Sequence, residues 1–326
     1  MQDIGPIVSH RGGLVKSSTT PRERISTGWL SVDKVLDGGL ADELYVIGGE
    51  TSTGKSAFAM SMAQNIAKQG VDVLFFSLGM GEDEHIARGI SSLSFQYHME
   101  DKDKRCFTAG DILYFSHDKD AGNFVQVPYQ AYEEYAEEYF ATYGDHLYIV
   151  EIKNGIDART IAEVSMRFME MHQKKVVVFV DYLQALQADD QDRSQTDRKT
   201  KIDSAVTTLK SLSATHKIPV IAISAVNRAS YKNKISTSAY KESGDTEYTG
   251  GVLIGWNWKG VTGESSEHIE IEKESCTRKG YREMEFDVLK FRNSQCNRSV
   301  PLMYYPAYNH FCERNGTDNE EIVLRV

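Results

Sequence analysis

A glycine-rich stretch near the N-terminus has the residue types and spacing of a phosphate-binding loop. Residues 49–56 read Gly-Glu-Thr-Ser-Thr-Gly-Lys-Ser, which is the pattern G-x-x-x-x-G-K-[ST]. In such a loop the backbone N–H groups surround the phosphates, the lysine neutralises the outer ones, and the serine hydroxyl helps to hold Mg²⁺. We therefore expect a nucleotide to be bound by the loop residues Gly49, Thr51, Ser52, Thr53, Gly54, Lys55 and Ser56.

An aspartate farther along the chain is suited to the same metal ion. Asp181 directly follows the apolar run 176–180, so it lies at the carboxyl end of a predicted buried strand. Ligands of parallel sheets gather at these ends, and an aspartate there can coordinate Mg²⁺ and its water shell. The alternative is an aspartate that only caps the next turn, but beside a phosphate loop the metal role is favoured. We predict that Ser56 and Asp181 hold the magnesium ion.

A phosphate loop needs a strand before it and a helix after it, and the sequence predicts both. Residues 44–47 are an apolar strand candidate, and residues 55–69 have helical four-residue spacing, with Gly70 at the position of a left-handed cap. The next predicted strand, 73–76, completes a strand–helix–strand unit of the length that a parallel crossover requires. This context favours a phosphate site over a glycine-rich turn with an incidental lysine.

The rest of the chain alternates between helical and apolar patterns. Interior strands of a parallel sheet are apolar on both faces, as several of these runs are. We predict an α/β fold with a mainly parallel sheet, helices on both faces and an antiparallel portion at the end. The predicted helices span 158–172 and 200–216, and the predicted strands span 176–180, 219–223, 252–254, 269–271 and 284–291.

Two stretches fit this alternation less well. Residues 1–24 are rich in Gly, Ser, Thr and Arg, and we expect an arm or linker there. Residues 95–144 are polar and aromatic, and we expect a partly helical insertion on the outside of the sheet. The remaining residues, 25–326, then form one domain that contains this insertion.

Composition and charge limit the class of protein. The net charge of −10 argues against a protein that coats nucleic acid with its whole surface, although it is compatible with a local basic channel. The four cysteines form no C-x-x-C pair, so neither a zinc knuckle nor a disulfide framework is indicated. There is no signal-peptide pattern and no run near the roughly 20 apolar residues of a membrane span. We therefore expect a cytoplasmic protein without membrane contact.

Together the motifs resemble the RecA-type motor domain of DnaB-type replicative helicases. The resemblance runs from residue 25 to residue 313 and includes D-Y-L-Q at 181–184 and K-x-R-N at 290–293. These two motifs are more specific than the phosphate loop, which recombinase and clock-protein relatives share, so such a relative is disfavoured. The resemblance implies a RecA-like P-loop NTPase core over residues 25–326.

The family implies a ring, usually of six subunits, with ATP bound between subunits and single-stranded DNA in the centre. By position, Lys55, Ser56 and Asp181 bind ATP and Mg²⁺. Lys290 and Arg292 would reach the γ-phosphate on the neighbouring subunit, and an exposed basic pair on an edge strand is the alternative. A primase or a loader is the kind of protein partner that the resemblance implies.

The sequence departs from the family pattern at two positions of the hydrolysis machinery. Where the family has a glutamate that polarises the attacking water, this chain has Gly79. Where the family usually has a glutamine after a strand-end serine, this chain has Ala225. Loss of a general base costs about 10²–10⁴-fold in rate. We therefore expect weakened hydrolysis, with Glu50, Glu82 and Glu84 as candidate replacement carboxylates.

The segment 227–241 is the candidate contact for single-stranded DNA. It follows the predicted strand 219–223 and carries Arg228, Lys232 and Lys234 together with tyrosines. Basic side chains neutralise phosphates, and tyrosines stack on bases. A solvated surface loop is the alternative reading of this polar segment.

Two functions remain open from the sequence. The first is an ATP-driven motor that acts on single-stranded DNA as a ring. The second is an assembly or regulatory module in which ATP drives ring formation and hydrolysis is vestigial. Gly79 and Ala225 favour the second, whereas Lys290 and Arg292 favour a ring in which ATP still matters. Residues 1–24 are too short to replace the helical collar domain of the family, and this does not decide between the two.

Overall fold

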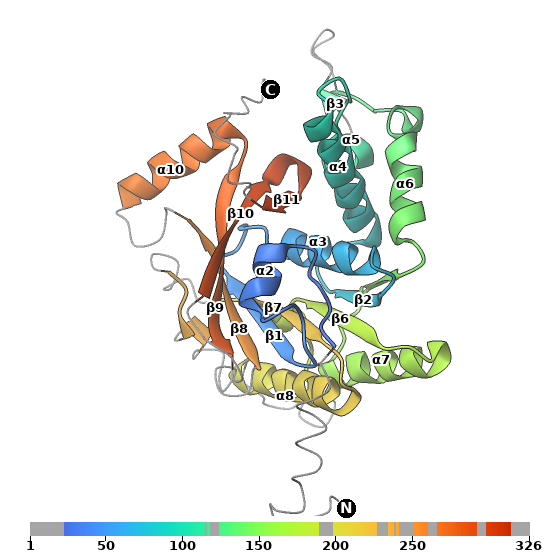
Figure 1. Ribbon diagram of the computed structural model, residues 1–326, viewed down its shortest axis with the longest axis vertical. Helices are drawn as coiled ribbons and strands as arrows, with labels where there is room; N and C mark the ends of the chain where they lie inside the picture. The colour runs from blue at the N-terminus through green and yellow to red at the C-terminus, as the bar shows by residue number, and fades with distance from the viewer. Residues whose placement is uncertain are drawn as a thin grey trace, which may run out of the picture.

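A nine-stranded sheet forms the centre of the part of the chain that the computed structural model describes (Figure 1). That part comprises residues 23–114, 116–117, 124–188, 198–226, 234–237, 239–240, 251–259, 266–291 and 298–313. The strand order is β11-β10-β9-β8-β1-β7-β6-β2-β5. The strands are β1 (Leu44–Gly49), β2 (Asp72–Ser77), β5 (Leu147–Glu151), β6 (Val176–Asp181), β7 (Val220–Ala225), β8 (Val252–Trp258), β9 (Arg282–Phe291), β10 (Arg298–Tyr305) and β11 (His310–Glu313).

The strands from β8 to β5 run parallel to one another, and β9, β10 and β11 complete the sheet in antiparallel pairs. Every residue of β1, β2 and β6 is buried, because these strands lie between two neighbours and are covered on both faces. The predicted α/β fold, with a mainly parallel sheet and an antiparallel end, is confirmed.

Helices cover both faces of the sheet and divide the core in two (Figure 1). On β1, odd-numbered residues such as Ile47 join the core beneath α2 and α3, and even-numbered residues such as Val46 join the core on α7 and α8. Strand β1 therefore belongs to both cores. The helices are α2 (Leu30–Val35), α3 (Lys55–Ala67), α7 (Ala158–His172) and α8 (Arg198–His216), and the 3₁₀ turns are η2 (Tyr129–Ala131), η3 (Leu183–Ala185) and η7 (Pro306–Tyr308).

The region between β2 and β5 forms a third, smaller core outside α3. It contains α4 (Glu82–Glu100), α5 (Ala109–Leu113), α6 (Glu133–Tyr143) and the short strands β3 (Ser116–His117) and β4 (Phe124–Val125). The Gln64 side chain donates a hydrogen bond of 3.1 Å to the Tyr139 hydroxyl and so joins α3 to α6. The predicted insertion, residues 95–144, lies within this region. Helix α4 begins at Glu82, so it runs across the predicted start of the insertion at residue 95.

One predicted element is wrong, and three strands of the nine-stranded sheet were not predicted. Residues 269–271, predicted as a strand, lie inside the helix α10 (Ser266–Lys279). Two isoleucines separated by one residue fit either pattern, and Ile271 is 53% exposed on the helix. The unpredicted strands are β5, β10 and β11. The edge strand β5 is only half-buried, although residues 147–150 form an apolar run that the sequence analysis did not assign.

The helix α4 is fixed to the end of β2 by a buried histidine. The Ser77 hydroxyl donates to the Met80 carbonyl (2.7 Å), and Nε2 of His85 lies 2.9 Å from the same hydroxyl. Since Ser77 has given its hydrogen to Met80, Nε2–H of a neutral His85 is the donor. Burial, and then the charge of Arg88, lower the pKa of His85 to about 4.

No described helix is both long and apolar enough to cross a membrane. Within the same residues, no group of three or more His, Cys, Asp and Glu side chains is arranged to hold a metal ion.

The buried His85 predicts a loss of stability in acid. The folded protein keeps His85 neutral down to about pH 4, whereas in the unfolded chain it takes up a proton below about pH 6.5. The free energy of unfolding therefore falls as the pH falls through this window, by about 3 kcal/mol. Urea unfolding between pH 7 and pH 4 should show a flatter pH dependence for His85→Gln than for the wild type. His172→Gln, at an exposed position, is the matched control, and equal slopes for all three proteins would contradict the assignment.

Candidate functional site

The predicted phosphate loop lies between the central strand β1 and the first turn of α3. Two of its residues have left-handed backbone conformations, Ser52 with φ 62° and Gly54 with φ 89°. The Tyr304 ring also restricts position 54, because a Cβ on Gly54 would lie 2.6 Å from Cε1 of that ring. Glycine is therefore required there both by conformation and by space.

Lys55 is held inside the loop by backbone carbonyls. Its Nζ donates to the carbonyl oxygens of Gly49 (2.9 Å) and Glu50 (2.6 Å). Burial lowers the pKa of Lys55 to about 8, and the carboxylates of Asp181 and Glu50 oppose this change. The ammonium group therefore stays charged at neutral pH and is available to phosphate oxygens.

The structure brings the two predicted magnesium ligands together. Asp181 ends β6 and is 6% exposed, and its carboxylate is hydrogen-bonded to the Ser56 side chain at the start of α3. Burial raises the pKa of Asp181, whereas this hydrogen bond and the charges of Lys55 and Arg88 lower it. A carboxylate next to a hydroxyl, both oxygen donors, is the chemistry that Mg²⁺ prefers in proteins.

Side chains from the neighbouring strands β8 and β9 hold the carbonyls of the loop. Nε1 of Trp256 donates to the Thr53 carbonyl (3.0 Å), and Nη1 of Arg282 donates to the Ser52 carbonyl (3.1 Å). The Arg282 guanidinium lies 4.6 Å from the centre of the Trp258 ring, in a cation–π contact. With two carbonyls engaged from one side, the loop is fixed before any phosphate arrives. Our sequence analysis missed these residues, because no local pattern links them to the loop.

Arg88 is a second residue that the sequence analysis missed. It lies on α4, is half-buried, and acts electrostatically on Asp181. It also lines a cleft between α3 and α4 together with Ser56, Met60 and His85. The spacing of His85 and Arg88, three residues apart on one helical face, is the signal that points to it.

The two positions that depart from the family pattern have different surroundings. A Cβ on Gly79 would meet only Cε1 of Tyr182, at the ordinary contact distance of 3.6 Å. At the end of β7, the Gln184 side chain donates to the Ala225 carbonyl (2.9 Å) and accepts from its N–H (3.0 Å). The Ala225 side chain itself takes no part in these bonds. A Cβ can therefore be accommodated at position 79, and the strand end at position 225 is held through its backbone.

The candidate replacement carboxylates occupy different places. Glu84 caps α4, because its carboxylate accepts from the Gly81 N–H at 3.1 Å. Glu82 is exposed in the first turn of the same helix. Of the three, Glu50 has the clearest link to the site, since its charge acts on Lys55.

The remaining predicted residues lie elsewhere. Lys290 is opposite Leu253, which pairs with Val46, whereas the phosphate loop begins three residues later, at Gly49. Lys290 is thus displaced along the sheet from this chain's own phosphate loop. Arg292 lies outside the described residues.

Of the predicted DNA contacts, Arg228 and Lys232 also lie outside the described residues. Nζ of Lys234 forms ion pairs with Glu285 (2.9 Å) and Asp287 (3.0 Å). A DNA phosphate would have to compete with these two carboxylates, and the DNA contact stays a prediction.

Two solved structures are similar in fold. One, described as "The Structure Of A DnaB-Like Replicative Helicase And Its Interactions With Primase", aligns with a TM-score of 0.73 and 19% identity, over 96% of this chain and 69% of that chain. The other, described as an ATPase domain, aligns with a TM-score of 0.70 and 19% identity, over 96% of this chain and 100% of that chain.

Curated relatives include the replicative DNA helicase DnaB of Treponema pallidum (strain Nichols), with 29% identity over 71% of this chain and 47% of the relative. The replicative DNA helicase DnaC of Bacillus subtilis (strain 168) is 24% identical over 70% of this chain and 46% of the relative. The chain thus spans about half the length of the curated relatives that it matches.

The family model described as "DnaB-like helicase C terminal domain" matches residues 24–109 and 120–313. This match includes the phosphate loop, Asp181 and Lys290. The chain belongs to the family of DnaB-like helicase C-terminal domains.

Proposed function

We propose that this chain is an ATP-binding RecA-type motor domain that acts on single-stranded DNA as a ring and hydrolyses ATP slowly. The observation that carries the proposal is the assembled site, in which Lys55, Ser56 and Asp181 meet at the carboxyl end of the sheet. The membership in a helicase domain family supports the same proposal.

In this proposal the N–H groups of residues 49–56 bind the phosphates of ATP. Lys55, which the carbonyls of Gly49 and Glu50 position, neutralises the outer phosphates, and Arg88 adds positive charge from α4. Ser56 and Asp181 would hold Mg²⁺, which when bound offsets the negative charge of the phosphates.

Slow hydrolysis follows from the two missing side chains. Gly79 has nothing with which to polarise a water molecule, and Ala225 has no polar group to contact the γ-phosphate. Binding would then proceed normally while turnover is reduced by the loss of a general base. The same two residues support the second candidate function, an assembly or regulatory module with vestigial hydrolysis.

A ring is supported by the place of Lys290. Because it is displaced along the sheet from its own phosphate loop, we infer that Lys290, with Arg292, serves the site of a neighbouring subunit, and that six subunits form the ring. Single-stranded DNA would lie against the segment 227–241, with Arg228, Lys232 and Lys234 as contacts. Since one similar structure is described with primase, a primase or a loader is the proposed partner, in the cytoplasm.

Lys55→Ala tests the nucleotide site. Because it removes the cation that neutralises the outer phosphates, we expect the affinity for a fluorescent ATP analogue to fall about 10- to 100-fold. Lys68→Ala, an exposed lysine just beyond the same helix, is the control and should bind normally. Equal affinity in wild type and Lys55→Ala would overturn the site assignment.

Gly79→Glu tests the hydrolysis. The position has room for a side chain, so a restored carboxylate should raise ATP turnover by on the order of 10²-fold without changing ATP affinity. Gly79→Gln has nearly the same shape but cannot act as a base, and it should stay slow. DNA-stimulated turnover in wild type as fast as in Gly79→Glu would contradict weakened hydrolysis. Turnover that stays negligible in Gly79→Glu, with ATP-dependent assembly intact, would favour the assembly module.

Mixing two inactive variants tests the role of Lys290 between subunits. In the Gly79→Glu background, Lys55→Ala and Lys290→Ala should each lose turnover, since each lacks one half of every site. When they are mixed, sites that combine an intact Lys55 with a neighbour's intact Lys290 should regain it. If the mixture assembles but stays as inactive as its components, Lys290 does not act across subunits.

A further inference from the structure

A short segment crosses the sheet beside the phosphate-loop strand. We call it the strap and define it as residues 234–237 and 239–240. Three of its side chains are buried against the core that contains α7 and α8, namely Ile235 (5% exposed), Ala239 (5%) and Tyr240 (0%). The strap is therefore part of the folded core.

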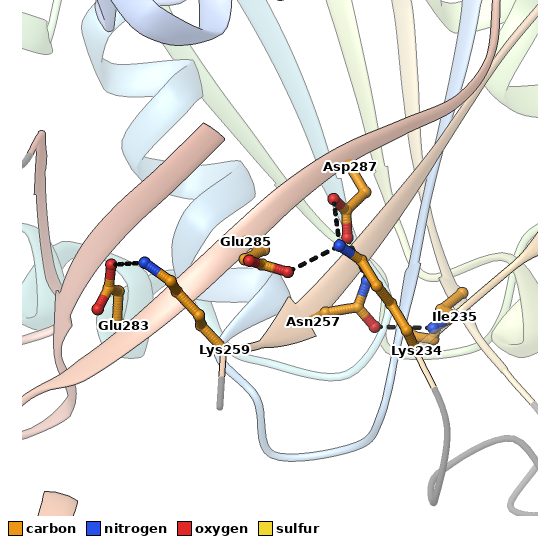
Figure 2. A network of polar contacts seen from close by, with 7 residues as sticks. All are labelled: Lys234, Ile235, Asn257, Lys259, Glu283, Glu285 and Asp287. Carbon is orange, nitrogen blue, oxygen red and sulfur yellow. Dashed lines mark hydrogen bonds and ion pairs between the residues drawn. The ribbon is translucent and has the colours of Figure 1, made fainter. Parts of the chain in front are cut away.

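Polar groups fasten one end of the strap to β8 and β9 (Figure 2). The Ile235 N–H donates to Oδ1 of Asn257 (2.9 Å), and Nδ2 of Asn257 donates to Asp287 (2.5 Å). Lys234 bridges Glu285 and the same Asp287. Since Asn257 and Asp287 are 2% and 4% exposed, the two hydrogen bonds of Asn257 are shielded from water and hold the backbone of the strap in place, whereas the Lys234 ion pairs lie at the surface.

The other end of the strap presses on the phosphate-loop strand. A Cβ on Gly48 would lie 2.4 Å from the hydroxyl oxygen of Tyr240, so the tyrosine occupies the space that a side chain would need. Gly48 pairs in register with Ser224 and Gly255, and the absence of a side chain at Gly48 makes room for the ring. The Tyr240 hydroxyl donates to the Ile254 carbonyl at 2.6 Å, which fixes the position of the ring.

The last two residues of β1 are held from opposite faces. Tyr240 lies against Gly48, and Trp256 lies against Gly49, where a Cβ would be 2.8 Å from the Trp256 carbonyl oxygen. The carbonyl of Gly49 is one of the two that hold Nζ of Lys55. A shift of β1 at Gly48 would therefore move the anchor of the lysine that binds phosphate.

We propose that Tyr240 is a positioning residue for the nucleotide site. The strap holds Gly48, and through it the Gly49 carbonyl and Lys55, in the geometry that receives phosphate. This inference rests on the proposed nucleotide binding. Lys234 anchors the strap, in addition to any contact with DNA. The strap therefore connects the segment predicted to bind DNA with the phosphate-loop strand β1.

The central experiment is a double-mutant cycle on the pair, with the affinity for a fluorescent, non-hydrolysable ATP analogue as readout. Gly48→Ala creates the clash with Tyr240 and should weaken binding on the order of tenfold. Tyr240→Leu opens the space, so the double variant should bind more tightly than Gly48→Ala alone. Tyr240→Phe removes only the hydroxyl and should weaken binding about 2- to 10-fold, even if the larger changes prevent folding.

Phe107→Leu separates positioning from general stability. Phe107 is 1% exposed in the core of α4 and α6, away from β1, so its loss should lower the melting temperature but leave ATP affinity unchanged. If the Tyr240 variants behave in the same way, or if the double variant is no better than Gly48→Ala, the inference is overturned. Failure of wild type to bind the analogue would instead overturn the proposed function.

The polar contacts that Lys234 and Asp287 make at one end of the strap can be tested separately. Lys234→Gln and Asp287→Asn should weaken ATP binding to a similar extent, because each releases the same end of the strap. If both variants bind ATP as tightly as the wild type, the contacts of Lys234 and Asp287 play no part in positioning the nucleotide site. A DNA contact by Lys234 would be seen separately, as a shallower salt dependence of single-strand binding in Lys234→Gln alone.

Discussion

The site depends on keeping a charged ammonium group buried at the end of the central strand. Burial lowers the pKa of Lys55, and two backbone carbonyls together with the Asp181 carboxylate compensate for the lost water. Those carbonyls must stay in place, so the loop around them is held by Trp256 and Arg282 on one side of β1 and by Tyr240 on the other. The packing of three separate parts of the chain thus follows from one buried charge.

Functional residues could be predicted from the sequence where they belong to one continuous motif or directly follow a recognisable strand. The phosphate loop is one continuous motif, and Asp181 follows from the rule that ligands gather at the carboxyl ends of parallel strands, so both could be predicted. Arg282 and Trp256 reach the loop from more than 200 residues away, through strand pairing that no local pattern encodes. Helix α10 was misread because two isoleucines separated by one residue fit a strand as well as an exposed helix. Strand β5 has an apolar run at 147–150, but it directly follows the polar stretch 95–144 and was not assigned.

The two halves of the sheet have different tasks. The parallel strands bring Gly49, Ser77, Asp181 and Ser224 to one edge, where chemistry on a nucleotide can take place. The antiparallel strand β9 supplies Arg282, which holds the loop, and it places Lys290 away from the loop. The two halves of the sheet thus contribute to the site in different ways.

The hydrogen bonds of Gln184 are made to the backbone of Ala225 and to the Ser224 hydroxyl, so the strand end is fixed whichever side chain follows that serine. At position 79, a Cβ would lie at an ordinary van der Waals distance from its only close neighbour, the Tyr182 ring. In evolutionary terms, position 79 can therefore change without displacing its neighbours. If this position governs turnover as proposed, a lineage that needed nucleotide binding more than turnover could lose catalysis there, and later regain it, on an unaltered scaffold.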